Sequence, residues 1–345
     1  MKKIFIYSLI LLALFLGSTH IALAQQSEFN LSTTPHAFDL TSLPGQKISK
    51  TIKVRNNTDT SLSLSVTIKK LIPDRSGQIL ISDFTSSEDY QHWLTIDSSS
   101  ISALPKEWVD VPFTITIPKD AAYGYYYAIL LSASQNQQAV NTPQAKLTGA
   151  IAIPVLLDVQ KNGTSFSGKL TNFVTSSGFY EYLPVTFLTT FVNMGNVHIK
   201  PHGDIFITDW KGTQVASLPV NKDLGSILPN GTRVFATDWN DSFITKDPKI
   251  VDNKVATDKN GNPTYELHLH FDRVLHLRMG KYIAHALLVV STDTKDISYE
   301  QTTTFWVFPW KIILGMLVFV LLAGIGLFNT LHSIWKHGKK LLKKS

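Results

Sequence analysis

Strict alternation of apolar and polar residues is the feature that most restricts the fold of this chain. From Leu62 to Ile68 every second residue is apolar and serine or threonine stands between, and the stretch from Val109 to Ile117 repeats the pattern. A period of two places the apolar side chains on one face of a β-strand and the polar ones on the other. The chain therefore has to build sheets that bury one face.

Turn-forming pairs such as Pro44-Gly45 and Asn260-Gly261 separate further candidate strands. These are 48–55, 79–84, 125–133, 149–159, 183–193, 204–209, 264–271, 282–292 and 301–308. No 3.6-residue period occurs before residue 309. We therefore predict an all-β fold of two tandem Ig-like β-sandwich domains, followed by a single transmembrane α-helix.

Internal similarity predicts where the two sandwiches lie. A strand that ends in Asn56 resembles one that ends in Asn193, and a Gly-Tyr segment at Gly124 resembles one at Gly280. The interval from Asn193 to Gly280 is longer than the interval from Asn56 to Gly124, which predicts an insertion near 241–262 in the second sandwich. The polar stretch 134–144 is either a hairpin loop or a linker. We place the first sandwich at 25–140 and the second at 146–308.

The two ends of the chain predict its location. Residues 1–24 have a basic start, an apolar run and small residues before a cleavage site after Ala24, as in a secretory signal peptide. Residues 310–331 are long and apolar enough to cross a bilayer, and 332–345 form a basic tail. We predict a single-pass type I protein of the cell membrane, with its ectodomain facing the cell wall or the outside and its tail in the cytoplasm. The expected anchors at the membrane interface are Trp306, Trp310, Trp335, Lys336, Lys339 and Lys340.

The charge balance excludes nucleic acid as the expected partner. The chain has 32 Lys and Arg and 26 Asp and Glu, for a net charge of +6. The two apolar ends hold eight of the basic residues and no acidic residue, so the middle is slightly acidic. The absence of cysteine also excludes a disulfide scaffold, a thiolate metal site and a cysteine nucleophile.

Catalytic motifs for serine hydrolases, zinc proteases, P-loop proteins and dinucleotide enzymes do not occur in the sequence. We predict a protein that is not an enzyme and needs no cofactor. The best alternative is a metal-dependent hydrolase that uses His268 and His270, because imidazoles two apart on a strand can share a metal. The simpler interpretation is the solvated face of an amphipathic strand, and we predict no metal site.

Four tyrosines between residues 123 and 127 form the best candidate for a ligand surface. Tyr123, Tyr125, Tyr126 and Tyr127 place rings on both faces of one strand, where some could stack on sugar rings or peptides. Core packing and a tyrosine corner are the competing explanation. Five N-x-[ST] sequons, at Asn30, Asn56, Asn162, Asn230 and Asn240, are a weak sign of glycosylation.

Several short motifs in the first module resemble the WxL-interacting protein family. They are LPGQ at 43–46, TIKVRNNTD at 51–59, GQI at 77–79, VPFTITIPKD at 111–120 and GY at 124–125. The order of signal peptide, two sandwiches, one membrane helix and basic tail is also similar. The resemblance implies that the first module binds peptidoglycan, that the second binds a host protein, and that the whole chain partners WxL-type surface proteins.

We thus expect a non-catalytic, membrane-anchored surface protein that binds cell-wall glycan and a protein partner, and so tethers a surface complex to the envelope. The alternative is an envelope chaperone or assembly factor that acts by complementing a strand at an open sheet edge. An unpaired edge, for instance along Leu62–Ile68, would favour this alternative.

Overall fold

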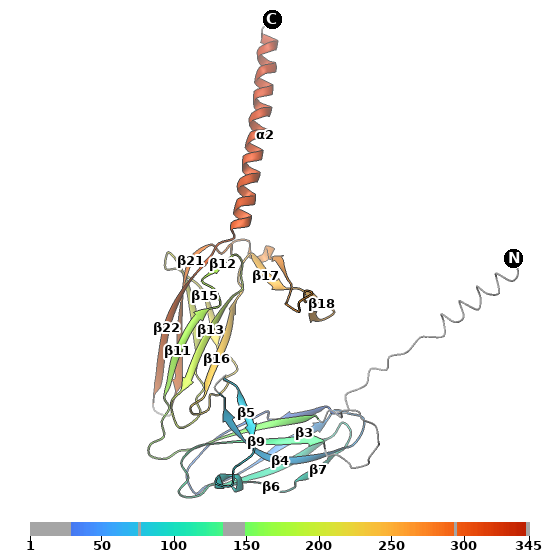
Figure 1. The fold of residues 1–345 in the computed structure, drawn as a ribbon, viewed down its shortest axis with the longest axis vertical. Coiled ribbons are helices and arrows are strands. Elements are labelled where there is room, and N and C mark those ends of the chain that lie inside the picture. Colours follow the sequence, from blue (N-terminus) through green and yellow to red (C-terminus); the bar gives the residue numbers. More distant parts are fainter. Residues whose placement is uncertain (1–28, 75–76, 134–148, 293–294, 343–345) are drawn as a thin grey trace, which may run out of the picture.

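The computed structural model describes residues 29–74, 77–133, 149–292 and 295–342. Two β-sandwiches stand at an angle to each other, and a long helix leaves the far end of the second sandwich (Figure 1). The prediction of an all-β protein with two Ig-like sandwiches and one C-terminal helix is confirmed. The predicted signal peptide and its cleavage after Ala24 lie outside the described residues.

The first sandwich packs a four-stranded sheet against a larger one. The smaller sheet has the order β1-β3-β8-β6, and the larger has the order β2-β10-β9-β4-β5, with β7 also paired to β4. The bounds are β1 (Leu31–Thr34), β2 (Phe38–Ser42), β3 (Lys47–Asn56), β4 (Leu62–Pro73), β5 (Ile79–Ser82), β6 (Leu94–Ile96), β7 (Ser100–Ala103), β8 (Trp108–Thr116), β9 (Tyr123–Ala133) and β10 (Ala150–Val159). A short 3-10 helix, η1 (Asp89–His92), precedes β6.

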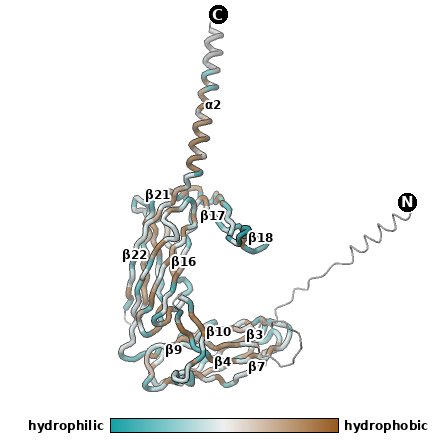
Figure 2. The backbone as a smooth tube through the Cα atoms, in the orientation of Figure 1, coloured by the Kyte–Doolittle hydropathy of each residue, from teal (hydrophilic) through white to brown (hydrophobic). Residues whose placement is uncertain are grey.

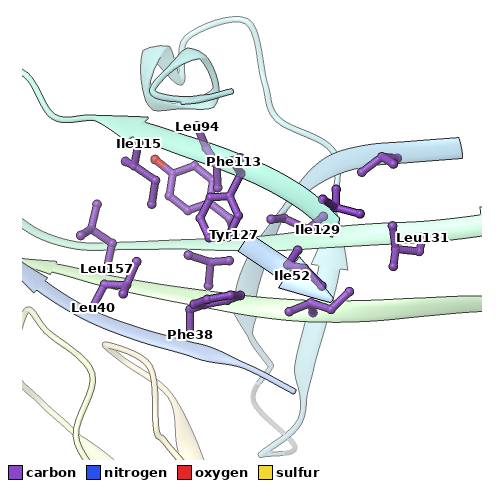
Figure 3. Close-up of a cluster of buried hydrophobic side chains, with 14 of the residues drawn as sticks. Phe38, Leu40, Ile52, Leu94, Phe113, Ile115, Tyr127, Ile129, Leu131 and Leu157 are labelled. Carbon is purple, nitrogen blue, oxygen red and sulfur yellow. The ribbon is translucent and has the colours of Figure 1, made fainter. Parts of the chain in front are cut away.

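Alternating apolar residues of both sheets meet in the core of the first sandwich. Figure 3 shows side chains from several strands interlocking around Phe113 and Tyr127, with Phe38 set edge-on to Phe113 at 5.0 Å between ring centroids. Tyr127 is fully buried, and its hydroxyl donates a hydrogen bond to the carbonyl of Tyr90 at 3.0 Å. The alternation seen in the sequence thus corresponds to inward-facing side chains of antiparallel strands.

The second sandwich repeats this design with a three-stranded sheet, β11-β13-β16, and a five-stranded sheet, β12-β22-β21-β14-β15. The bounds are β11 (Gly168–Thr175), β12 (Phe179–Tyr180), β13 (Val185–Asn193), β14 (His202–Asp209), β15 (Gln214–Val220), β16 (Thr232–Trp239), β21 (Gly280–Ser291) and β22 (Asp296–Val307). Trp239, Phe187 and Phe305 fill the centre of its core.

One buried asparagine closes the same turn in both sandwiches. The amide of Asn56 donates to the carbonyl of Thr60, four residues on, and its oxygen accepts from the backbone N–H of Thr58. Asn193 does the same with the carbonyl of Val197 and the N–H of Gly195. The repeat at Asn56 and Asn193 is therefore a repeat in structure. Because Asn56 is fully buried, its sequon is inaccessible in the folded chain.

A ribbon projects from the second sandwich where the insertion near 241–262 was expected. It pairs β17 (Ile244–Pro248) with β20 (Tyr265–Leu269), carries β18 (Ile250–Val251) and β19 (Lys254–Val255) at its tip, and is followed by η2 (Phe271–Arg273). The helix α2 (Trp310–Leu342) begins three residues after β22. Figure 2 shows the apolar character of its first two thirds.

Two details of the predicted organisation are wrong. Strand β10 pairs antiparallel with β9 and parallel with β2, so the first sandwich continues to Val159 and does not end at 140. The polar stretch 134–144 lies outside the described residues, but the strands on either side of it pair with each other. The helix also continues through the segment 332–342 that was expected to be a separate tail.

Candidate partner-binding interface

An open strand edge faces the junction of the two sandwiches. Strand β5 is the last strand of its sheet, and it pairs with the end of β4 from Lys70 to Pro73. Its residues Ile79, Leu80 and Ile81 are 42%, 44% and 45% exposed. Neighbouring residues of a strand point to opposite faces, so this apolar ribbon is uncovered on both faces. Natural proteins usually protect such edges with charges, prolines or covering segments.

A second edge strand stands beside the first. Strand β16 ends the three-stranded sheet of the second sandwich and pairs with β13 along its whole length, from Thr232 to Trp239. Val234, on its outer face, is 48% exposed. Figure 1 shows β16 on the side from which the β17–β20 ribbon projects, above the β4–β5 hairpin.

A pocket of about 320 Å³ joins these two strands. Pro73, Gly77 and Ile79 line it from the first sandwich, and residues 226–228 and 231–233 line it from the second. Gly77 lies directly against β16, because a Cβ atom added to it would stand 2.9 Å from the carbonyl oxygen of Thr232. The β4–β5 hairpin thus bridges to the second sandwich and leaves the edge of β5 open beside the pocket.

We expect Gly77→Ala to loosen this bridge. Gly77 has a φ of +89°, and its Cβ would clash with backbone. Gly212 is a matched control, because its φ is +83° and nothing lies within 4 Å of its Cβ position. Both changes cost about 1 kcal/mol of backbone strain, and Gly77→Ala should cost about 1 to 3 kcal/mol more from the clash. Equal losses in chemical denaturation would contradict the bridge.

A buried histidine locks the two sandwiches together. His198 comes from the second sandwich, and its side chain lies between two aspartates of the first. Its Nδ1–H donates to Asp158 at 3.0 Å, and its Nε2–H donates to Asp39, also at 3.0 Å. Lys200 adds an ion pair to Asp39, and the hydroxyl of Tyr126 donates to Asp158 at 3.3 Å.

The charges of this cluster support one another. Burial alone would lower the pKa of His198, but the hydrogen bonds to Asp158 and Asp39 outweigh it and raise that pKa to about 9. The hydrogen bond from His198 lowers the pKa of Asp39 to about 2. His198 is therefore an imidazolium at neutral pH, and it holds the interface as a charged bridge.

Apolar contacts surround this bridge. Leu71, Tyr126, Ala128 and Leu156 of the first sandwich form a small buried cluster with Leu228 of the second. The outer face of the β4, β9 and β10 sheet is therefore partly covered by the second sandwich. The angle between the sandwiches seen in Figure 1 is fixed by packing as well as by charge.

The predicted tyrosine surface is mostly used inside the fold. Tyr127 is fully buried, Tyr126 is 8% exposed at the domain interface, and Tyr125 packs against Trp93. The hydroxyl of Tyr125 accepts a hydrogen bond from the N–H of Ala122, three residues earlier, which makes the expected tyrosine corner. Tyr123 has a positive φ of 73° and lies beside Gly163. The four rings form no shared platform, because Tyr125 and Tyr127 pack in the core of the first sandwich and Tyr126 in the domain interface.

The two histidines of the alternative metal-dependent hydrolase, His268 and His270, have separate partners in the structure. His268 lies 3.3 Å from Glu266, whereas His270 follows the end of β20 and its Nε2 contacts the hydroxyl of Thr245 at 2.8 Å. In the described ranges, no three His, Asp or Glu side chains gather in a way that could hold a metal ion. The opposite face of β20 is not buried as an amphipathic strand would require, since Leu267 and Leu269 are 53% and 55% exposed.

The expected membrane anchors stand at the two ends of the apolar helix. Among the described residues, one helical stretch, Trp310–His332, is long and apolar enough to cross a membrane. Trp306 and Trp310 lie at its start and are exposed, and Trp335 follows its end. Lys336, Lys339 and Lys340 fall in the last turns of α2.

Sequence reasoning missed the residues that form the interface. His198 belongs to no sequence motif, and the open edge was expected at Leu62–Ile68. That stretch lies inside the sheet, because β4 pairs with β9 on one side and with β7 and β5 on the other. The sequence does carry one signal for the true edge, since ILIS at 79–82 breaks the alternation with three consecutive apolar residues.

No family model and no curated protein matches this chain. Solved structures with a similar arrangement include the class 5 fimbriae chaperone CfaA, at 11% identity and a TM-score of 0.38, covering 80% of this chain and 99% of that one. The CsuC–CsuE chaperone–tip subunit complex of Acinetobacter baumannii matches at 10% identity and a TM-score of 0.37, covering 79% of this chain and 98% of that one. The Escherichia coli chaperone DraB matches at 12% identity and a TM-score of 0.34, covering 79% of this chain and 98% of that one. At such low identities and TM-scores, the likeness does not indicate what this chain binds.

Proposed function

We propose that this chain is a non-catalytic, membrane-anchored protein that holds an extended apolar segment of a protein partner at the junction of its two sandwiches. The segment adds as a strand to the open edge of β5 and rests against the pocket shared with β16. The observation that carries the proposal is the edge of β5, where three consecutive apolar side chains stand exposed beside that pocket.

The rest of the molecule supports this role. The charged bridge at His198 and the contact at Gly77 fix the sandwiches, so the pocket between them is preorganised and does not have to form on binding. The β17–β20 ribbon, on which Leu267 and Leu269 are exposed, projects from the same side of the second sandwich as β16 (Figure 1). An assembly factor that shields an aggregation-prone apolar segment of its partner would need exposed apolar surfaces of this kind.

Paired charge substitutions test the proposal. Ile79→Asp together with Ile81→Asp places two carboxylates where the partner's apolar side chains would pack, which is costly for buried unpaired charges. Leu43→Asp is the control, because Leu43 is 53% exposed in the same sandwich but lies in a turn. We expect the double variant to lose the co-purified partner at least tenfold after crosslinking in native membranes. Recovery equal to that of the control would contradict the proposal.

Peptidoglycan binding by the first sandwich is a second proposal, and it is supported by the family resemblance of residues 43–59 and 111–125. The near-neutral ectodomain implies binding that survives moderate salt, because bulk charge would not drive it. Co-sedimentation of the purified chain with protein-free peptidoglycan, at low salt and at about 0.5 M salt where surface pairs are screened, tests this. If the chain sediments with peptidoglycan at both salt concentrations, glycan binding is supported. If it stays in the supernatant at both, the peptidoglycan proposal is contradicted.

A further inference from the structure

A loop next to the membrane helix exposes several large apolar side chains within ten residues. After β20 the chain runs through η2 to β21, and in this loop Phe271, Val274 and Leu275 are 75%, 53% and 96% exposed. Leu277 and Met279 are 44% and 46% exposed. Water-exposed protein surfaces rarely gather so many large apolar side chains in ten residues, and such patches mark contact sites.

The backbone of this loop, residues 270–279, is held in place. Phe243 donates its N–H to the carbonyl of His276 at 3.0 Å, and His276 donates its own N–H to the carbonyl of Arg273 at 2.8 Å. Asp241 accepts from the guanidinium of Arg278 at 2.5 Å and lies 2.8 Å from Nδ1 of His276. The apolar side chains are therefore presented by a fixed loop.

The loop lies at the point where α2 leaves the sandwich. Leu277 and Arg278 line a small cavity together with Pro309, the residue before α2. The uncharged run of the helix begins at Ile312, only three residues later. The headgroup layer on each side of the hydrocarbon core is about 6 Å thick. A loop beside Pro309 is therefore at the depth of the lipid headgroups.

Other exposed aromatics share this end of the second sandwich. Trp210, in the turn between β14 and β15, is 67% exposed and lies next to Gly280, which follows the loop. The amine of Lys211 stands 5.0 Å from the ring centre of Trp210, and the amine of Lys311 stands 5.5 Å from that of Trp310. Tryptophan and lysine in this combination are typical of side chains at a membrane–water interface.

We propose that loop 270–279 inserts Phe271, Val274 and Leu275 into the leaflet that α2 enters first. The ectodomain then has two contacts with the bilayer, the helix and this loop. A single flexible connection would let the sandwiches tilt freely, whereas two contacts fix the second sandwich and hold the pocket at a set height above the lipid surface. The occupant of this apolar surface is the bilayer itself, because the loop lies against Pro309 at the base of the membrane helix.

The absence of cysteine makes a direct test simple. In the full chain reconstituted into vesicles, Leu275→Cys is labelled with an environment-sensitive fluorophore, and the quencher is a lipid with a nitroxide high on its acyl chain. Leu104→Cys is the negative control, because Leu104 is 52% exposed in the first sandwich, and Ile313→Cys in α2 is the positive control. Leu275 is almost fully exposed, so its substitution leaves the core unchanged.

We expect the label at 275 to be quenched at least threefold more than the label at 104, and to approach the label at 313. Equal quenching at 275 and 104 would overturn the proposal, whether both values are low, as for a loop that stays in water, or both are high, as for a chain that lies flat on the vesicle. The result is independent of any protein partner.

Discussion

Replacing His198 by alanine should lower the free energy of unfolding by about 3 to 5 kcal/mol, because it leaves buried carboxylates without their charged partner. Asp158 is 6% exposed and receives one of its hydrogen bonds from the imidazole of His198. His202→Ala is the matched control, since His202 lies in the same region but its Nδ1 contacts the backbone carbonyl of Lys200 at 3.1 Å. Urea unfolding of the purified chain in detergent measures both.

The pH dependence separates a charged bridge from simple packing. The pKa of His198 is about 9 in the folded chain and 6.5 when exposed, so the bridge is at full strength below pH 6.5 and is lost as the pH rises through 9. The wild-type chain should lose about 3 kcal/mol across that range. The pKa of Asp39 is lowered to about 2 from 3.8, so its contribution persists above pH 3.8 and is lost as the pH falls through 2. A His198→Ala chain that showed the same loss between pH 6.5 and 9 would contradict the bridge.

The buried asparagines should give the next largest effect. We expect Asn193→Ala to cost about 3 kcal/mol or more, because it leaves the carbonyls of Val197 and Ile227 and the N–H of Gly195 without their partner. Asn56→Ala should cost a similar amount in the first sandwich, where the carbonyls of Thr60 and Ala103 lose theirs.

The control for both variants is Asn260→Ala, at an exposed turn of the projecting ribbon. It should change stability by less than about 0.5 kcal/mol, as surface substitutions usually do. Each substitution is made alone, and thermal unfolding of each single variant measures the loss in the sandwich that carries it. If Asn193→Ala lowered stability no more than Asn260→Ala, the hydrogen bonds of the repeated turn would not stabilise the sandwich as expected.

The strands with clean alternation were the easiest to predict from sequence. Segments 48–55 and 282–292 match β3 and β21 to within a residue or two, because each buries one face against a continuous core. Strands β1, β7 and β16 were missed, since they are edge strands with short or mixed patterns. Edge strands bury less of each face, so the period of two is weaker.

The candidate interface could not be predicted for a different reason. The charged bridge joins residues up to 159 positions apart in the chain, namely Asp39, Asp158 and His198. None of them belongs to a recognisable sequence motif. Only the docking of the two sandwiches brings them within hydrogen-bond distance. The burial of Tyr126 could not be predicted for a related reason, because its ring faces a second sandwich whose placement the sequence did not reveal.

Binding along β5 is the central claim, and site-specific photocrosslinking in living cells tests it most directly. A photoreactive phenylalanine analogue is placed at Leu80, with a second chain carrying it at Leu43 as the control of similar exposure. We predict a discrete protein adduct at position 80, none at position 43, and loss of the adduct when Val234→Asp is added on β16. The same adducts at both positions, an adduct that Val234→Asp leaves unchanged, or an adduct that a muramidase digests would contradict the claim.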